Sequence, residues 1–313
     1  DHPFCYDQAL SGAPDAAIVL TIDKNHMTYL NRFYPSILTT GFLPLAGKSV
    51  VKCPKDISDR KYDIVYLGGT SRLFIEQSRP DYSRYEFDAR AIGDEAYEMM
   101  LSDSSITTED ALERCLREHD IILTDDRMRA FFSEMRYVDM MIVTHFREAV
   151  MESMARAGLN IAVYGVGWEA CDWIDLPNVD YHKRIPASET YAIMGETKIV
   201  LSTMTWFKDG AHDRIYSGML SGAMVVSDTS AYMKENYSYY SIAKQRAGIE
   251  VTDEELVMFE LDETDRLPGL VQKLLSDEEK MQRIVDNGRR RAMVTDTWSA
   301  RANELHRDLL SQM

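Results

Sequence analysis

The sequence predicts an α/β fold with a doubly wound parallel sheet. Short apolar runs that are typical of buried strands alternate with amphipathic helical segments along most of the chain, and this order favours parallel pairing. The 313 residues allow two domains or one large α/β domain with an ample core. Hydrophobic residues make up 45% of the chain and charged residues 27%, which is ordinary for a globular protein.

The N-terminal part is expected to contain one strand and one helix. Residues 17–22 form an apolar run, Asp23 suits the N-cap of a helix over residues 26–33, and Pro35 ends that helix. Residues 42–45 form a short extended piece, and the charged residues 52–61 form a candidate linker. Because the chain begins with Asp-His-Pro and not with Met, we expect an upstream segment that this chain lacks.

A second strand and a long helical region follow. Residues 62–67 form a strong apolar run and precede Gly68-Gly69-Thr70-Ser71. Residues 85–157 are expected to be largely helical, with one helix start at Thr107 or Thr108. Apolar residues recur at every fourth position from Val138 to Met154, and Gly158 ends that helix.

Strands and helices alternate in the rest of the chain. Strands are expected at residues 161–164, 179–182, 199–201, 224–226 and 257–261. Helices are expected at residues 188–197, where Ser188 is the N-cap, and at residues 267–275, 277–291 and 297–310.

The segment 202–228 combines a strand end, a loop, a helix and a strand. We expect the helix to open at Asp209 and Gly210 and to end at Gly222. Its buried face is expected to consist of Ile215, Met219 and Leu220.

Polar groups gather where that helix begins. Backbone N–H groups at a helix N-terminus bind anions, phosphate above all, and a basic side chain such as Arg214 strengthens such a site. The alternative is a surface helix whose His212 and Arg214 are merely solvated.

Charge and cysteine content exclude several classes of protein. The net charge of −16 argues against a nucleic-acid surface and against docking on anionic lipid by charge alone. The four cysteines are scattered without a CxxC pair, so neither a zinc site nor a disulfide framework is indicated. With no signal peptide and no run of 18 apolar residues, we expect a cytoplasmic protein.

Ligands of doubly wound sheets bind at the carboxyl ends of the strands, so the strand-end loops are the places to examine. Glycine, histidine and arginine gather in these loops. Residues 165–170 match G-x-G-x-x-A after a strand, which suggests a dinucleotide fingerprint. We reject it because a proline and no helical face follow, and these glycines more simply serve a tight turn or a close backbone approach.

Candidates for a general base lie near the N-terminus. His2, with Asp23 or His26, would activate a hydroxyl nucleophile. The alternative assigns Asp23 to a helix N-cap and His2 to an ordinary loop. His145 is expected to be a core or surface histidine, and no catalytic triad spacing, HExxH motif or P-loop occurs.

Several of these segments resemble one family. Val163-Tyr-Gly-Val-Gly-Trp168, Gly210-Ala-His-Asp-Arg214, Gly222-Ala-Met-Val-Val-Ser-Asp228 and Thr297-Trp-Ser-Ala-Arg301 are the most specific matches. They are similar to bacterial glycosyltransferases of the GT-B fold with a glycosyltransferase-family-1-like C-terminal domain, in the group related to the spore-maturation CgeB-like proteins.

The resemblance implies two Rossmann-like domains, the N-terminal one incomplete here. It divides the chain into part of an acceptor-side domain (residues 1–55), a donor-side domain (56–295) and a C-terminal helix (296–313) that packs back on the N-terminal domain. The implied function is transfer of a sugar from a nucleotide-sugar donor to a hydroxyl acceptor, such as a glycan, a cell-surface component or a protein.

The resemblance also implies where the donor binds. The diphosphate would meet the helix near Gly210, the base would meet the loop at Arg184, and no metal or cofactor is needed because side chains and the helix dipole hold the leaving diphosphate. The expected donor-binding residues are Gly68, Gly69, Tyr164, Gly165, Gly167, Trp168, Arg184, Thr203, Asp209, Gly210, His212, Arg214 and Ser217.

Two features depart from the family pattern. Many GT-B enzymes carry two glutamates eight positions apart around this helix, whereas Asp209 and Ser217 stand here. The residues before the linker are also too few for a full acceptor domain. A non-catalytic nucleotide-sugar-binding or interaction module is therefore the alternative function, and a sugar-nucleotide epimerase would need a carboxylate and histidine cluster that the sequence does not reveal.

Overall fold

The computed structural model describes residues 3–14, 17–249 and 252–312, and its contacts divide the chain into two compact units. Unit 1 consists of Asp1–Pro44, Ser71–His145 and Thr205–Gly210. Unit 2 consists of Leu45–Thr70, Phe146–Met204 and Ala211–Met313.

These units differ from the boundaries expected at residues 55 and 295. Residues 71–145 group with the N-terminal residues because helix α5 (Asp125–Glu134) packs against α2 (Lys24–Phe33) and against a short 3-10 turn, η1 (Pro3–Cys5). The C-terminal residues 296–313 group with unit 2, and their packing on an acceptor domain stays a prediction.

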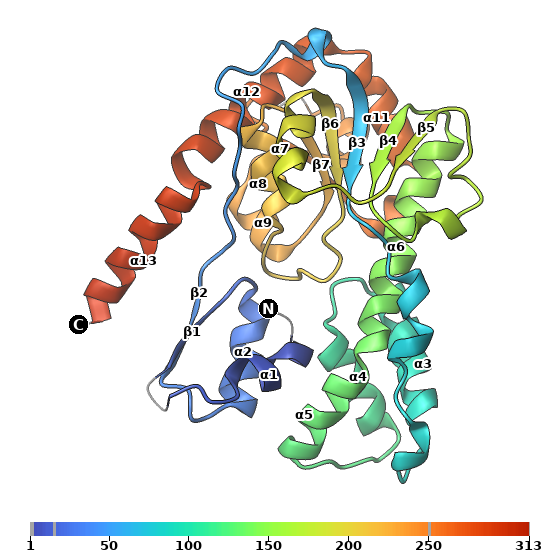
Figure 1. The fold of residues 1–313 in the computed structure, drawn as a ribbon, viewed down its shortest axis with the longest axis vertical. Helices are drawn as coiled ribbons and strands as arrows, with labels where there is room; N and C mark the ends of the chain where they lie inside the picture. Colours follow the sequence, from blue (N-terminus) through green and yellow to red (C-terminus); the bar gives the residue numbers. More distant parts are fainter. Residues whose placement is uncertain (1–2, 15–16, 250–251, 313) are drawn as a thin grey trace. The chain divides into compact units, whose positions relative to one another are not determined.

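Unit 2 is built on one parallel sheet of seven strands in the order β5-β4-β3-β6-β7-β9-β8 (Figure 1). The strands are β3 (Tyr62–Leu67), β4 (Ile161–Tyr164), β5 (Val179–His182), β6 (Thr197–Ser202), β7 (Met224–Asp228), β8 (Tyr239–Tyr240) and β9 (Leu256–Phe259). Every pairing in this sheet is parallel, as predicted.

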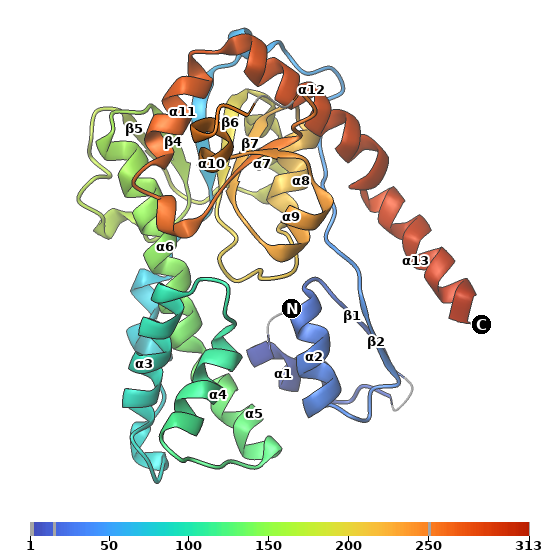
Figure 2. The same ribbon diagram turned by 180° about the vertical axis from the view of Figure 1, so that it is seen from behind.

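Helices cover both faces of this sheet. α7 (Ala187–Gly195) and α8 (Asp213–Leu220) lie on the face toward the viewer in Figure 1, and α11 (Leu267–Leu275) lies on the face shown in Figure 2. Unit 2 also contains the second half of α6 (Arg136–Arg156), the helices α9 (Ala231–Asn236), α10 (Ile242–Arg246), α12 (Glu278–Thr295) and α13 (Trp298–Gln312), and the 3-10 turns η2 (Ile57–Asp59), η6 (Trp168–Ala170) and η7 (Leu261–Glu263). Helix α7 begins at Ala187 after Pro186 and not at the predicted Ser188.

The core explains why the strands were recognisable. β4, β7 and β9 are buried along their whole length, because helices cover both faces of a parallel sheet and leave no polar alternation. The two-residue strand β8 and the short helices α9 and α10 were not predicted, since they are too short to carry a periodic pattern.

Unit 1 is mostly helical around a two-stranded parallel sheet. β1 (Ile18–Thr21) pairs with β2 (Thr39–Phe42), which lies earlier than the extended piece predicted at residues 42–45. Its other elements are α1 (Tyr6–Leu10), α2, α3 (Ala89–Ser102), α4 (Thr108–Glu118), α5, the start of α6 (Arg136–Arg156) and the 3-10 turns η3 (Arg72–Phe74), η4 (Glu76–Ser78) and η5 (Tyr82–Arg84). No helix among the described residues has the length and apolarity that crossing a membrane requires.

Among the described residues, helices α6, α8 and α10 end in the same glycine motif, and two of these ends, at Gly222 and Gly158, were predicted. After α8, Gly222 donates its N–H to Met219 O and Ala223 donates to Gly218 O, with Gly222 at φ +77°. After α6, Gly158 and its successor make the equivalent two bonds at φ +78°. Both glycines adopt the left-handed conformation that this helix end requires, as predicted.

The two glycine caps differ in what surrounds them, and this generates a prediction. Gly158→Ala should lower the free energy of unfolding by about 1 kcal/mol, the cost of a left-handed non-glycine residue. Gly222→Ala should cost about 2–4 kcal/mol, because its Cβ would also lie 2.7 Å from Pro54 Cβ, whereas nothing lies within 4 Å at Gly158. Urea unfolding of the two variants measures the difference, and equal losses would contradict the tight packing at Pro54.

Candidate functional site

The carboxyl edge of the unit 2 sheet contains the point at which the strand order reverses. β3 lies between β4 and β6, so the chain first extends the sheet on one side of β3 and later returns to its other side. In open α/β sheets, ligands bind outside the carboxyl ends of the strands at such a point. Gly68 and Thr203, which follow β3 and β6, therefore mark the candidate site.

Two glycine-rich loops meet at this edge and hold each other in place. The N–H of Gly68 donates to the carbonyl of Tyr164 (2.8 Å), and the N–H of Thr70 donates to the carbonyl of Val166 (2.9 Å). A Cβ atom on Gly69 would lie 2.6 Å from the carbonyl oxygen of Val166. The closeness of the two loops therefore requires glycine here.

Trp168 is a buried support of the second loop. Its indole N–H donates to the carbonyl of Gly68 (2.8 Å), and its ring packs edge-on against Tyr66. Gly167 adopts φ +94°, and only the 3-10 turn η6 follows it. No helix opens at the second glycine, so the rejection of a dinucleotide fingerprint is confirmed, while donor contacts of Gly167 and Trp168 stay predictions.

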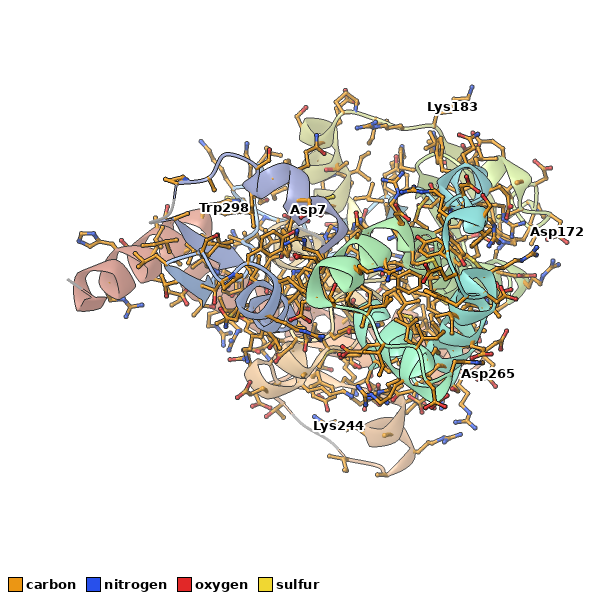
Figure 3. All side chains as sticks on the ribbon, turned by 90° about the horizontal axis from the view of Figure 1, so that it is seen from below. Asp7, Asp172, Lys183, Lys244, Asp265 and Trp298 are labelled. Carbon is orange, nitrogen blue, oxygen red and sulfur yellow. The ribbon has the colours of Figure 1, made fainter. Side chains whose placement is uncertain are left out.

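A cavity of about 370 Å³ opens beside these loops. Tyr164, at the end of β4, stacks on His182, at the end of β5, with 4.4 Å between ring centres. The side chain of Lys183, the next residue after β5, points outward from the molecule (Figure 3). The structure thus brings five of the predicted donor residues to one cavity, together with Ile185 and Thr190: Gly68, Gly69, Tyr164, Gly165 and Arg184.

Two arginines from different helices converge next to this edge. Arg147, from α6, donates to the carbonyl of Gly69 and, through Nε, to Thr203 Oγ1 (3.4 Å). Arg214, from α8, donates to Ser202 Oγ (3.3 Å). The two guanidinium groups therefore contact residues at the carboxyl ends of β3 and β6.

The electrostatics of this pair favour an anion. Among the residues that the structure describes, neither guanidinium lies within ion-pair distance of a carboxylate. Burial lowers the pKa of Arg214 and the charge of Arg147 lowers it further, whereas Tyr66, Asp213 and Asp228 oppose this shift. Two like charges held partly out of water repel each other, and a bound anion would relieve that repulsion.

Helix α8 begins at Asp213, later than predicted, and His212 is its N-cap. His212 Nδ1 lies 3.1 Å from the backbone N of Arg214 and 2.6 Å from Asp213 Oδ1, and only one of these contacts is a hydrogen bond in a given protonation state. Burial lowers the pKa of His212, and the nearby charge of Arg214 lowers it further. The buried face of the helix (Ile215, Met219 and Leu220) is confirmed.

Asp209 and Gly210 do not open this helix, which corrects the prediction. Both belong to unit 1, where Gly210 forms an antiparallel bridge with Asp23 and the N–H of Asp209 donates to Asp23 Oδ2 (3.0 Å). A Cβ on Gly210 would collide with the carbonyl of Ile22. The bridge therefore explains why position 210 is glycine. A donor contact of Asp209 or Gly210 stays a prediction.

Asp23 is a buried structural carboxylate. Its Oδ1 accepts the N–H of Asn25 (2.9 Å) at the start of α2, and its Oδ2 accepts the N–H groups of Lys208 (2.8 Å) and Asp209. The alternative reading of Asp23 as an N-cap is confirmed. A general base needs a lone pair that faces the substrate, so these contacts argue against the catalytic role, which stays a prediction.

The candidate histidines lie apart from the arginine pair in the chain. His26 is on α2 and lines a second cavity, within unit 1. His2 lies outside the described residues, so its role as a base stays a prediction. In the part of the chain that the structure describes, no three His, Cys, Asp or Glu side chains are placed to hold a metal ion.

Ser217 is covered by a neighbouring segment. Its Oγ accepts the backbone N–H of Lys48 (3.1 Å), and Gly47 packs against the α8 backbone at Tyr216. The position expected to replace a ribose-binding glutamate is therefore engaged by this chain itself, and its contact with a ribose stays a prediction.

Three residues of the site were missed from the sequence: Tyr66, Arg147 and Ser202. Tyr66 and Ser202 read as strand residues, and Arg147 reads as one of many charges on a long helix. One signal in the sequence could have identified Arg147. It directly follows Phe146, a predicted core residue, so the aliphatic part of the Arg147 side chain starts close to the core.

The contacts of Asp23 predict a local rather than a catalytic defect in Asp23→Ser. Serine retains a cap for α2 but leaves the N–H groups of Lys208 and Asp209 without their acceptor, at a cost of about 2 kcal/mol. Hydrogen exchange should accelerate at these two amides. Asp88→Ser, at the exposed N-cap of α3, is the matched control. Unchanged exchange at both amides in Asp23→Ser would show that the Asp23 carboxylate does not protect them.

Comparisons with known proteins agree with this architecture. The structure is similar to sucrose-phosphate synthase from Thermosynechococcus elongatus, with 11% identity, a TM-score of 0.51 and coverage of 99% of this chain and 62% of that one. It also matches TarM (11% identity, TM-score 0.47, coverage 96% and 45%) and Anabaena Alr3699/HepE in complex with UDP (13% identity, TM-score 0.43, coverage 99% and 96%). The chain thus spans about three fifths of the synthase and less than half of TarM. No curated protein matches the sequence.

The likeness to the synthase shows the fold, and the predicted α/β, GT-B-like class is confirmed. A family model described as glycosyl transferase-like matches residues 147–307. This region starts at Arg147 and includes Arg214 and the whole sheet except β3. Because the match extends over more than half of the chain, the chain belongs to the glycosyl transferase-like family.

Proposed function

We propose that this protein transfers a sugar from a nucleotide-sugar donor to a hydroxyl acceptor. The observation that carries the proposal is the pair of arginines, Arg147 and Arg214, at the carboxyl edge of β3 and β6. Arginine suits phosphate because its planar guanidinium donates in parallel to two oxygens. A diphosphate would neutralise both charges at a place where the described residues supply no carboxylate partner.

The helix α8 supports the same position. It presents its N-terminus beside Arg214, and a helix N-terminus carries a partial positive charge together with free N–H groups. When the bond between the sugar C1 and the diphosphate oxygen breaks, the leaving diphosphate gains negative charge. The two guanidinium groups and the helix end would stabilise that charge, and on this ground we propose that transfer is independent of metal and of any cofactor.

The larger cavity suits the rest of the donor. It is lined by loop backbone at Gly68 and Gly165 and by Arg184, Ile185 and Thr190, which offer apolar surface and a few polar groups. We place the nucleoside there, with the base toward Arg184. The sugar would then lie toward Thr203, and the acceptor hydroxyl would form the new bond to C1 and release its proton to a base.

The finer assignments of group and location are also part of the proposal. We place the protein in the bacterial CgeB-like group, on the motifs at residues 163–168, 210–214, 222–228 and 297–301. All four cysteines are free thiols in the structure, which supports a reducing compartment such as the cytoplasm.

Removal of either arginine should weaken binding of the diphosphate. A thermal-shift screen with UDP, GDP, TDP and CMP identifies the base, and calorimetry then measures affinity. Arg147→Ala and Arg214→Ala should each lower affinity for the nucleoside diphosphate by about 10–100-fold, the value of a charge-assisted hydrogen-bond pair. Affinity for the nucleoside alone should change little.

Arg156→Ala is the matched control, because Arg156 ends the same helix as Arg147 but pairs with Glu152 and Asp172 at the surface. If Arg147→Ala binds the diphosphate as tightly as Arg156→Ala, the donor site is misplaced. Donor binding without hydrolysis or transfer would instead favour the non-catalytic module.

The lowered pKa of His212 predicts proton uptake when a diphosphate binds. Burial and Arg214 keep the free imidazole neutral near pH 7, and a nearby anion favours the protonated form. The added proton would go to Nδ1, which faces Asp213 Oδ1. The contribution of His212 to affinity should therefore rise as the pH falls.

Calorimetry in two buffers of different ionisation enthalpy measures this uptake directly. His212→Asn keeps a good N-cap but cannot take up the proton, so the difference between buffers should disappear. Equal heats in both buffers for the wild-type protein would place the anion away from His212.

A further inference from the structure

Unit 1 contains a cavity of its own, of about 120 Å³. It lies between α2, the first turns of α4 and the loop of residues 205–210. Four aromatic side chains line it: Tyr29, Phe33, Phe132 and Trp206. An apolar cavity of about 150 Å³ is large enough for one benzene ring, so this cavity is large enough for one small group of a ligand.

The charge of the lining is mostly negative. Its acidic members are Asp23, Glu109, Asp110, Glu113 and Asp139, and its basic members are Arg32 and Lys208. Both basic groups are engaged by this chain. Arg32 pairs with Glu113 (2.7 Å) and Asp125 (2.9 Å), and Lys208 Nζ donates to the carbonyls of Ser104 (2.7 Å) and Thr205 (2.6 Å).

A buried hydroxyl on the cavity wall lacks a hydrogen-bond partner. The side chain of Tyr29 is 7% exposed, and its hydroxyl makes no hydrogen bond to any described residue. An unsatisfied buried hydroxyl is costly and calls for an explanation, such as a ligand that pairs with it. Burial raises the pKa of Tyr29, and the charges of Glu109 and Asp7 raise it further, while Arg129 and Arg32 oppose the shift.

We propose that this cavity binds the protonated amine of an amino sugar. Carboxylates such as that of Asp110 would bind the ammonium group, and the aromatic faces would add cation–π attraction. Asp110 is exposed, and its carboxylate makes no hydrogen bond or ion pair with another described residue, so it is available. The carboxylates of Glu109, Asp110 and Glu113 lie in the first two turns of α4 and offset the positive end of that helix.

The amino sugar would act as an acceptor through a hydroxyl, and this part rests on the proposed function. An ammonium nitrogen has no lone pair, so it positions the molecule and does not react. A hydroxyl oxygen of the same molecule would form the bond to the donor sugar C1 as the C1–diphosphate bond breaks, with its proton passing to a base or water. His26 lines the same cavity, which places one predicted base beside the acceptor.

Binding of three probes to the full chain tests the site without any nucleotide. Glucosamine carries the cation, and N-acetylglucosamine and glucose are neutral on the same ring. Glucosamine should bind at least about tenfold more tightly than either neutral sugar, as a charge-assisted hydrogen bond provides. Equal affinities, or no binding of glucosamine, would overturn the proposal.

Two variants and one matched control locate the binding. Asp110→Asn should remove most of the preference for glucosamine. Tyr29→Phe should weaken glucosamine binding without lowering the melting temperature, since it deletes a hydroxyl that stabilises nothing in the free protein. Asp126→Asn changes the same charge on the adjacent α5, outside the cavity, and should have no effect. If Asp110→Asn behaves like Asp126→Asn, the cavity is not the site.

A transfer assay separates this proposal from the proposed function. Glucosamine binding with no nucleoside diphosphate binding would overturn the donor assignment and support the cation site. Binding of both, with no transfer to glucosamine, would overturn its role as the acceptor.

Discussion

The pairing of β3 on both edges is the constraint on which the rest of unit 2 depends. β3 forms parallel ladders with β4 and with β6, so its backbone groups are satisfied on both sides and its carboxyl end is fixed at the reversal of strand order. The chain must then turn away between two neighbouring strand ends. Only glycine at positions 69 and 165 allows the loops to approach as closely as they do.

The arginine pair is a consequence of this edge. The ends of β3 and β6 supply three hydrogen-bond acceptors. The carbonyl of Gly69 and the hydroxyls of Ser202 and Thr203 accept from the two guanidinium groups. These neutral acceptors orient Arg147 and Arg214 but do not cancel their charge. The fold thus maintains a positive site near a low-dielectric core, at a cost in repulsion that a dianionic ligand would offset.

Patterns within a few residues were predictable, and contacts between distant residues were not. The strands 62–67, 161–164 and 179–182 were predicted to the residue, because β-branched and aromatic residues recur in each segment and glycine or polar residues bound it. A helix start at Thr107 or Thr108 was predicted from the capping residue type, and Thr107 is the N-cap. The predicted start of α8 was wrong because the N–H of Asp209 donates to Asp23, which is distant in the sequence.

Asp23 fixes the segment of chain that connects the residues of the two candidate sites. Hydrogen bonds from the N–H groups of Lys208 and Asp209 to Asp23 hold the segment 205–210 in unit 1. Trp206 and Lys208 of this segment line the cavity of unit 1. The same segment connects Thr203, at the end of β6, to His212 and Arg214 at α8. The carboxylate of Asp23 therefore fixes this connection, because its two oxygens accept three backbone N–H groups, while its role as a general base stays a prediction.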